Sequence, residues 1–132
     1  LHLCDRRQRQ MCIETACKLL GTNFSETTLN HILLHECNAG YINLAMSKMN
    51  QVRFAHCLFR NGSFNDCRFS SVAFDSCDLV EADFSHAPLR GIDLRTSRIS
   101  GITLNTSDLK GAIITSLQAM DLLPLLGVII ED

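Results

Sequence analysis

Large apolar residues recur at every fifth position along most of the chain. Counted in fives from position 19 to position 114, every residue is apolar, and all seven Phe of the protein are among them. We call this position i. Five steps along an α-helix turn a side chain through roughly 500°, and five steps along a flat strand move it to the opposite face. The pattern therefore predicts neither a long helix nor a simple strand.

Small or β-branched residues occupy the position two residues before i. They include Cys17, Thr22, Thr27, Ile32, Cys37, Val52, Cys57, Cys67, Val72, Cys77, Ala82 and Ala87. Within a short strand, i−2 and i point to the same side, so both can face a core, and another residue of the unit must form a turn. The chain is therefore expected to wind into a coil around its apolar side chains.

Residues 20 positions apart resemble one another, which sets the expected size of the coil. If each five-residue unit forms one side, four units close a coil, and successive coils stack about 4.8 Å apart through parallel hydrogen bonds. One column of the sequence reads Cys17, Cys37, Cys57, Cys77 and Ser97, and another reads Ile32, Val52, Val72, Ile92 and Ala112. Because like residues stack on like residues, we predict a coil of 20 residues.

This pattern resembles the pentapeptide-repeat family, whose units have the form A(D/N)LXX. The stretch DLVEADFSHAPLRGIDL is a good local match, with Ala82, Asp83 and Phe84 in the three diagnostic places. The resemblance covers about residues 17–114 and implies an all-β solenoid, a right-handed quadrilateral parallel β-helix of about five coils. Residues 1–16 are expected to form an N-terminal cap, either irregular or helical. Because the chain starts with Leu1 rather than Met, we also expect a preceding portion in the natural protein.

Residues 115–132 are expected to close the other end of the stack, because a solenoid exposes its core and strand edges at both ends. Thr115 and Gln118 fit a capping box, and Gly127 suits a helix end. Pro124 is expected to shorten or kink the last helical turn. An apolar stripe at helical spacing is formed by Ala119, Leu122, Leu123 and Leu126. Residues 128–130 are expected to form a short strand.

The stretch SLQAMDLLPLLGVII is also similar to the C-terminal module of the quinolone-resistance branch of this family, where a helix and a strand form a homodimer. The alternative is a lid that packs only on its own coil. We favour the homodimer because large exposed apolar patches are uncommon. The candidate dimer interface consists of Leu122, Leu123, Leu126, Val128, Ile129 and Ile130.

Composition and cysteine usage narrow the class of protein. The net charge of −2 indicates neither a basic nucleic-acid binder nor a long acidic tail. The seven Cys are odd in number and six follow the core repeat, so we expect reduced, inert thiols in a cytoplasmic protein. The longest apolar run, residues 122–130, is far shorter than the roughly 20 residues that span a bilayer, so no membrane association is expected.

No phosphate-binding loop, nucleophile elbow or paired-cysteine metal motif occurs in the sequence. We therefore expect no enzyme, no catalytic residue, no cofactor and no metal. The most suggestive cluster is His35, Glu36 and His56, which the coil would bring to one corner. A metal needs three or four converging ligands with ordered neighbours, so a solvated ion pair is the favoured interpretation.

Outward-facing charges separate by face of the expected coil. A candidate acidic face carries Glu26, Asp66 and Asp83, and the opposite candidate basic face carries Lys48, Arg68, Arg90 and Lys110. The favoured hypothesis is a non-catalytic structural or interaction protein with an unidentified protein partner. An ordinary solvated face is the favoured interpretation of the basic residues, because four cations are few for nucleic-acid affinity, and nucleic acid is not expected as a partner.

The family resemblance implies an alternative function. A DNA mimic would occupy a type II topoisomerase (gyrase) and confer quinolone resistance. A rod of five coils would be about 24 Å long, and duplex DNA of that length carries roughly 14 charges. Over residues 15–114 nine basic residues balance nine acidic ones, so the charge count disfavours this alternative.

Overall fold

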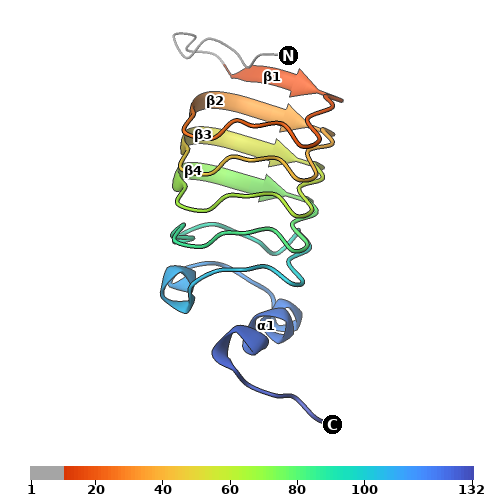
Figure 1. Ribbon diagram of the computed structural model, residues 1–132, viewed down its shortest axis with the longest axis vertical. Coiled ribbons are helices and arrows are strands. Elements are labelled where there is room, and N and C mark those ends of the chain that lie inside the picture. Colours follow the sequence, from red (N-terminus) through yellow and green to blue (C-terminus); the bar gives the residue numbers. More distant parts are fainter. Residues whose placement is uncertain (1–10) are drawn as a thin grey trace.

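Parallel strands stack along one side of the computed structural model, which describes residues 11–132 (Figure 1). They are β1 (Cys12–Thr15), β2 (Thr28–His35), β3 (Lys48–Ala55) and β4 (Arg68–Asp75), hydrogen-bonded in that order within one sheet. Each strand pairs with the equivalent segment of the next coil, as in Cys12↔Ile32, Ile32↔Val52 and Val52↔Val72. This register agrees with the coil length predicted from the sequence columns.

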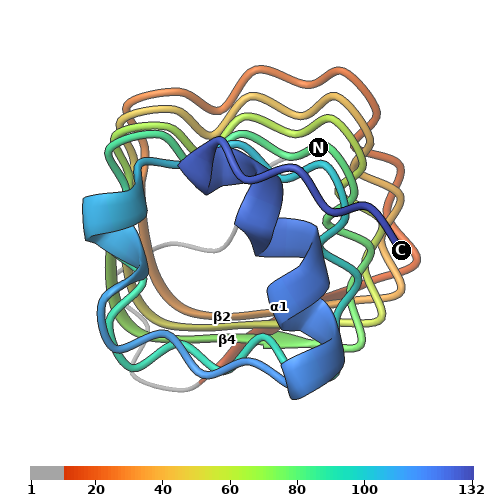
Figure 2. The ribbon, with the colours of Figure 1, turned by 90° about the horizontal axis from the view of Figure 1, so that it is seen from below.

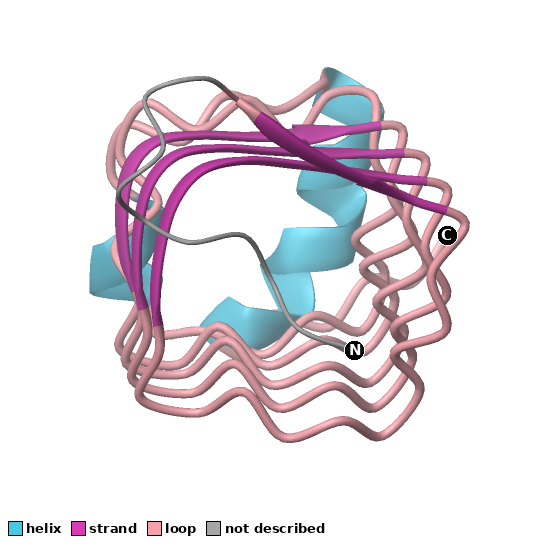
Figure 3. Ribbon diagram, turned by 90° about the horizontal axis from the view of Figure 1, so that it is seen from above, coloured by secondary structure: helices cyan, strands magenta, loops and turns pink. Residues whose placement is uncertain are grey.

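The other sides of each coil are joined by isolated bridges rather than by full strands. These bridges keep the same register, from Lys18↔Asn38 down to Asp93↔Ile113. Viewed along the stack, the coils superpose around a common interior (Figure 2 and Figure 3). The molecule is therefore a parallel β-solenoid with a short helix at its C-terminal end.

The corners of the coil are formed by residue i+2 of the five-residue unit, which adopts the left-handed backbone region. In one coil these residues are Glu26, His31, Glu36 and Tyr41, with φ of 57°, 56°, 55° and 57°. A non-glycine residue enters this region at a cost of roughly 1–2 kcal/mol. The corners persist because the hydrogen bonds and core contacts between coils outweigh that cost. The turn expected in each unit thus lies at i+2.

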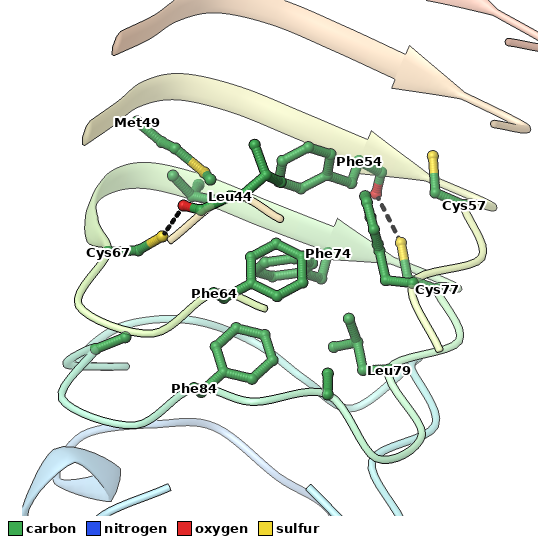
Figure 4. Close-up of a cluster of buried hydrophobic side chains, with 14 of the residues drawn as sticks. Leu44, Met49, Phe54, Cys57, Phe64, Cys67, Phe74, Cys77, Leu79 and Phe84 are labelled. Atoms are coloured by element: carbon green, nitrogen blue, oxygen red, sulfur yellow. Dashed lines mark hydrogen bonds between the residues drawn. The ribbon is translucent and has the colours of Figure 1, made fainter. Parts of the chain in front are cut away.

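Positions i and i−2 fill the interior, as predicted. Phe54, Phe64, Phe74 and Phe84 are fully buried. Phe54 and Phe74 stack with ring centroids 5.1 Å apart, and Phe64 meets Phe74 edge to face at 5.8 Å (Figure 4). Phe69 is only partly buried against this cluster. The core is thus a continuous stack of rings and aliphatic side chains along the solenoid axis.

Strand β1 corrects the prediction of a cap over residues 1–16. Cys12–Thr15 pairs in parallel with the second half of β2, so these residues already belong to the first coil. Glu14 occupies position i, where the repeat has an apolar residue, and the apolar side chain of Ile13 points outward. The apolar repeat is therefore not visible in the sequence of this segment. Parallel pairing needs only backbone groups in register, so one polar residue at position i does not prevent it. The rest of the predicted cap, residues 1–10, lies outside the described residues.

The C-terminal cap begins with α1 (Ser116–Leu122), which follows the 3₁₀-helix η1 (Thr106–Leu109). The predicted capping box is confirmed: Gln118 N donates to Thr115 Oγ1 at 3.0 Å, and Thr115 N donates to Gln118 Oε1 at 2.9 Å. Pro124 lies at the start of the 3₁₀-helix η2 (Leu123–Leu126), so the α-helix ends before it. Gly127, with φ of 75°, ends η2.

The short strand predicted for residues 128–130 is not formed. Val128, Ile129 and Ile130 are exposed and pair with no strand within the described chain. A strand requires the backbone of a partner, and this sheet ends at β4, two coils before the cap. Among residues 11–132, no helix is long and apolar enough to cross a membrane.

Candidate interaction surfaces

The buried cysteines of one column donate hydrogen bonds to the backbone of the preceding coil. Cys57 Sγ donates to Leu34 O at 3.3 Å, and Cys77 Sγ donates to Phe54 O at 3.3 Å (Figure 4). Ser97 continues this column, and its Oγ donates to Phe74 O at 3.0 Å. Each side chain satisfies a backbone carbonyl of the preceding coil. Burial of the column was predicted, whereas this hydrogen bond was not.

These thiols behave as buried core side chains rather than as reactive groups. Burial raises the pKa of the Cys67 thiol to about 11, so it stays protonated and unreactive at neutral pH. The free thiols of the described residues are Cys17, Cys37, Cys57, Cys67 and Cys77. Cys12 shares position i−2 with these thiols.

The His35, Glu36 and His56 cluster forms an exposed polar corner. His35 Nε2 lies 3.5 Å from Glu36 Oε1, and the rings of His35 and His56 meet edge to face with centroids 5.9 Å apart. Thr15 Oγ1 lies 3.2 Å from His35 Nδ1. Within residues 11–132, no three His, Cys, Asp or Glu side chains are arranged to hold a metal ion. The geometry therefore gives a His–Glu contact at the surface, as the sequence indicated.

The structure does not bring the candidate acidic face together. Glu26 and Asp66 are corner residues of one column, but they are two coils apart and Met46 stands between them. Asp83 lies in another column, where its Oδ1 accepts hydrogen bonds from Ser85 N at 2.9 Å and Ser85 Oγ at 2.6 Å. Asp83 thus stabilises a turn. Because Asp83 is separated from Glu26 and Asp66, the three carboxylates form no continuous negative surface.

The candidate basic face consists of two pairs in neighbouring columns. Lys48 and Arg68 are neighbours in register on β3 and β4 at position i−1. Arg90 and Lys110 lie on the next two coils at position i+1, where Pro88 and Asp108 continue the column of Lys48 and Arg68. All four side chains are exposed. Arg68 is anchored, because its Nη1 donates to Cys67 O at 3.2 Å and to His86 O at 3.1 Å. We call these four residues the basic strip.

The basic strip has no carboxylate partner within residues 11–132, a property that it shares with the exposed residues Lys18 and Arg98. Three arginines elsewhere on the surface are paired, Arg53 with Asp75, Arg60 with Asp78 and Arg95 with Asp93. In the Arg95 pair, hydrogen bonds from the guanidinium lower the pKa of Asp93 to about 2. None of the basic-strip residues joins an ion pair with any described residue.

A shallow hollow of about 230 Å³ lies beside Lys48 and Arg68 of the basic strip. Residues that line it include Thr28, Lys48, Asn50, Arg68, Phe69 and Ser70. The side chains of Asn50 and Ser70 are exposed, and the partly buried ring of Phe69 adds an apolar floor. Sequence reasoning missed this hollow. The signal was the succession of short polar residues Asn30, Asn50 and Ser70 beside two long cations.

Gln118 closes the C-terminal end of the stack. Its Nε2 donates to Leu94 O at 2.6 Å and to Ser97 O at 2.8 Å. In the coils above, the equivalents of Leu94 O accept from a side chain of the next coil and the equivalents of Ser97 O accept from its backbone N–H, so Gln118 replaces both donors. Its place in the capping box was predicted, whereas this second role was not.

The candidate dimer interface requires one correction. Leu122 is only 8% exposed and belongs to the hydrophobic core, because α1 turns this side chain toward the coils. Leu123 is partly buried, whereas Leu126, Val128, Ile129 and Ile130 are exposed. Leu117 and Met120, which were not predicted, add to this apolar area with exposures of 80% and 51%. We call the six residues Leu117, Met120, Leu126, Val128, Ile129 and Ile130 the C-terminal apolar surface.

Comparison with family models agrees with this repeat geometry. A model described as a pentapeptide repeat region matches residues 10–84, and one described as pentapeptide repeats (8 copies) matches residues 77–115. The chain belongs to the pentapeptide repeat family. The resemblance noted from the sequence is thereby confirmed.

Solved structures of other pentapeptide repeat proteins have a similar fold. HetL, involved in heterocyst differentiation regulation in the cyanobacterium Nostoc sp. strain PCC 7120, matches with a TM-score of 0.57 and 18% identity over 79% of this chain and 45% of HetL. Rfr23 from the cyanobacterium Cyanothece 51142 matches with a TM-score of 0.50 and 14% identity over 78% of this chain and 91% of Rfr23. This chain thus spans less than half of HetL.

A third solved structure is QnrB1, a plasmid-mediated fluoroquinolone resistance protein, with a TM-score of 0.44 and 16% identity over 91% of this chain and 81% of QnrB1. No curated protein matches the chain. At these identities the structural similarities describe the fold and leave the partner of this pentapeptide repeat protein open.

Proposed function

We propose that this pentapeptide repeat protein is a non-catalytic interaction protein that binds a protein partner through the outer faces of its solenoid. The observation that carries the proposal is the filled interior: the side chains at i and i−2 occupy the space that a buried pocket would need. Small-molecule sites are concave and largely enclosed. Members of this family are generally non-catalytic structural or interaction proteins, which supports the same function.

The proposal includes a finer description of the rod. We infer a right-handed quadrilateral β-helix of about five coils, supported by bridges in one register from Lys18↔Asn38 to Asp93↔Ile113. Left-handed corner residues at every fifth position from Ala16 to Gly91 support the four-sided outline. Such a rod presents flat faces on which equivalent side chains repeat about every 4.8 Å. This spacing suits contacts with an extended protein segment.

We also propose that the protein forms a homodimer through the C-terminal apolar surface. Each of its six side chains is at least 44% exposed, and Ile129 is 82% exposed. Monomers seldom expose contiguous apolar patches of large area, so a second copy is the favoured occupant. Leu122 and Leu123 would support this surface from inside each protomer.

The interaction function is tested by affinity capture with the full chain, followed by reconstitution from purified components. We expect a captured protein to form a complex of fixed stoichiometry, measured by size-exclusion chromatography with light scattering. The proposal fails if no captured protein reassembles with the purified chain.

Gyrase binding by DNA mimicry is the second candidate and is not favoured. Glu26 and Asp66 are separated by two coil steps, about 9.6 Å, and Asp83 is engaged in a turn. Duplex DNA carries one charge per roughly 1.7 Å of axis. We expect the purified protein to leave gyrase supercoiling unchanged. Inhibition that is lost on reversing Glu26 and Asp66 to Lys would favour the mimic instead.

A further inference from the structure

We propose that an acidic peptide segment of a protein partner docks along the basic strip and places one side chain in the hollow beside Phe69. This inference rests on the proposed interaction function and adds to it the surface and the chemistry of the partner. It comes from three features of the same face: unpaired cations, unpaired polar groups and a partly exposed ring.

The cations of the strip have no carboxylate partner within residues 11–132, as is also true of Lys18 and Arg98, whereas Arg53, Arg60 and Arg95 are paired. Lys48 and Arg68 occupy equivalent positions on adjacent strands, where coil stacking places their backbones about 4.8 Å apart. Two positive charges at this spacing repel each other, whereas a carboxylate placed between them attracts both. Arg68 is already held by two backbone carbonyls, so part of the strip is pre-organised for an anion.

The hollow supplies groups that match a peptide. The side chains of Asn50 and Ser70 make no hydrogen bond within residues 11–132, and both are exposed at the rim. They can donate to and accept from a peptide backbone that crosses the strands. The ring of Phe69 gives an apolar floor for the methylene or aromatic part of one peptide side chain. An acidic segment that contains an apolar residue satisfies all of these groups.

The charges around the strip favour a peptide over a nucleic acid. From Lys48 to Lys110 the strip covers three coil steps, about 14 Å. Asp66 and Asp108 lie two residues before Arg68 and Lys110, respectively, and would face a continuous phosphate backbone unfavourably. Four cations also release few counterions from nucleic acid. A short peptide with two or three carboxylates matches the charge of the four cations.

The test uses a fluorescein-labelled ten-residue peptide of alternating Glu and Phe or Val, with binding to the full chain measured by fluorescence anisotropy. We expect saturable binding that weakens with salt. Lys48→Glu and Arg90→Glu should each weaken it by roughly tenfold, the factor that corresponds to one lost charge contact. Lys18→Glu, an equal charge reversal at an exposed residue on another face, should change it by less than about twofold.

A second pair of variants tests the hollow without changing charge. Ser70→Phe fills the hollow and should weaken peptide binding, whereas Ser100→Phe at the equivalent i+1 position on another side of the coil should not. Circular dichroism establishes that each variant is folded.

Three results would overturn the inference. They are absence of peptide binding, equal loss in Lys48→Glu and Lys18→Glu, and tighter, Lys48-dependent binding of a single-stranded oligodeoxynucleotide of equal length. The interaction function fails separately: if a reconstituted partner binds wild-type and Lys48→Glu protein equally, that function stands and only the assignment to the basic strip is wrong.

Discussion

Phe64 and Phe84 stack face to face, with ring centroids 4.7 Å apart and ring planes 1° from parallel, although they belong to successive coils and lie a full coil apart in the sequence. Parallel coils in register place equivalent side chains directly above one another, so each ring loses most of its solvent contact to its counterpart. Offset-stacked rings add to the burial of apolar area. The stability of this solenoid therefore depends on contacts between coils more than on contacts within one coil.

We predict that Phe64→Ala lowers the free energy of unfolding by about 3–5 kcal/mol, the usual cost of removing a fully buried ring. Chemical denaturation followed by circular dichroism measures the change. Leu58→Ala is the matched control, because Leu58 lies on an adjacent side of the same coil but is 48% exposed. Equal destabilisation by the two variants would contradict the inward placement of position i.

The buried thiols predict a loss of stability at high pH. Burial raises the pKa of Cys67 from 9.0 to about 11, so between these values the unfolded chain releases its proton while the folded chain keeps it. Because the unfolded state then binds fewer protons, stability is constant below the unfolded pKa and falls as the pH rises through the folded one. The difference between the two pKa values corresponds to about 2–3 kcal/mol at most.

The matched variant for this prediction is Cys67→Ser, which retains a donor for Leu44 O but does not titrate in this range. The stability difference between wild-type protein and Cys67→Ser, measured by urea denaturation, should shift in favour of the variant as the pH rises. A difference that is independent of pH would argue against a buried thiol at this position.

Removal of the Gln118 side chain should open the C-terminal end of the stack. Gln118→Ala removes the donors to Leu94 O and Ser97 O and half of the capping box, and we expect a loss of about 1–3 kcal/mol. Hydrogen exchange should accelerate in α1 and in residues 94–97 while β2 and β3 stay protected. Ser116→Ala, an exposed change in the same helix, serves as the control. Unchanged protection of the last coil in Gln118→Ala would contradict the capping role.

The C-terminal apolar surface predicts a change of oligomeric state. We expect the wild-type protein to sediment as a dimer and Ile129→Asp to sediment as a monomer of unchanged stability, because Ile129 is exposed within one protomer. Leu122→Asp should instead unfold the cap, since it places a carboxylate in the core. A wild-type monomer at high protein concentration would rule out this interface.

Much of the fold could be predicted from the sequence because the repeat acts locally. Large residues at i and small ones at i−2 determine which side chains face inward, and the columns of like residues that recur once per coil reveal the register. The corner conformation gave only a partial signal: Gly21, Gly91, Gly101 and Gly111 stand at i+2, but residues such as His31, Tyr41 and Met46 adopt it without glycine. These residues are held there by neighbouring coils, which a single unit of sequence does not describe.

The errors at the two ends have a similar cause. Glu14 interrupts the apolar pattern, yet Cys12–Thr15 pairs through its backbone and so extends the sheet. At the other end, the apolar stripe did not reveal that Leu122 faces the coils while Leu117 and Met120 face solvent. The basic strip was predicted as a face. Its missing partners and the hollow at Phe69 depend on side-chain positions in three dimensions.

The most direct test of this account is the sequence separation of backbone contacts in solution, measured by nuclear Overhauser effects on the isotopically labelled protein. Parallel coils in register predict contacts between Val52 and Val72 and between Phe64 and Phe84, with the same separation repeated from coil to coil along the chain. A different separation, or mainly short-range helical contacts within residues 12–114, would contradict the stacked solenoid on which every surface described above depends.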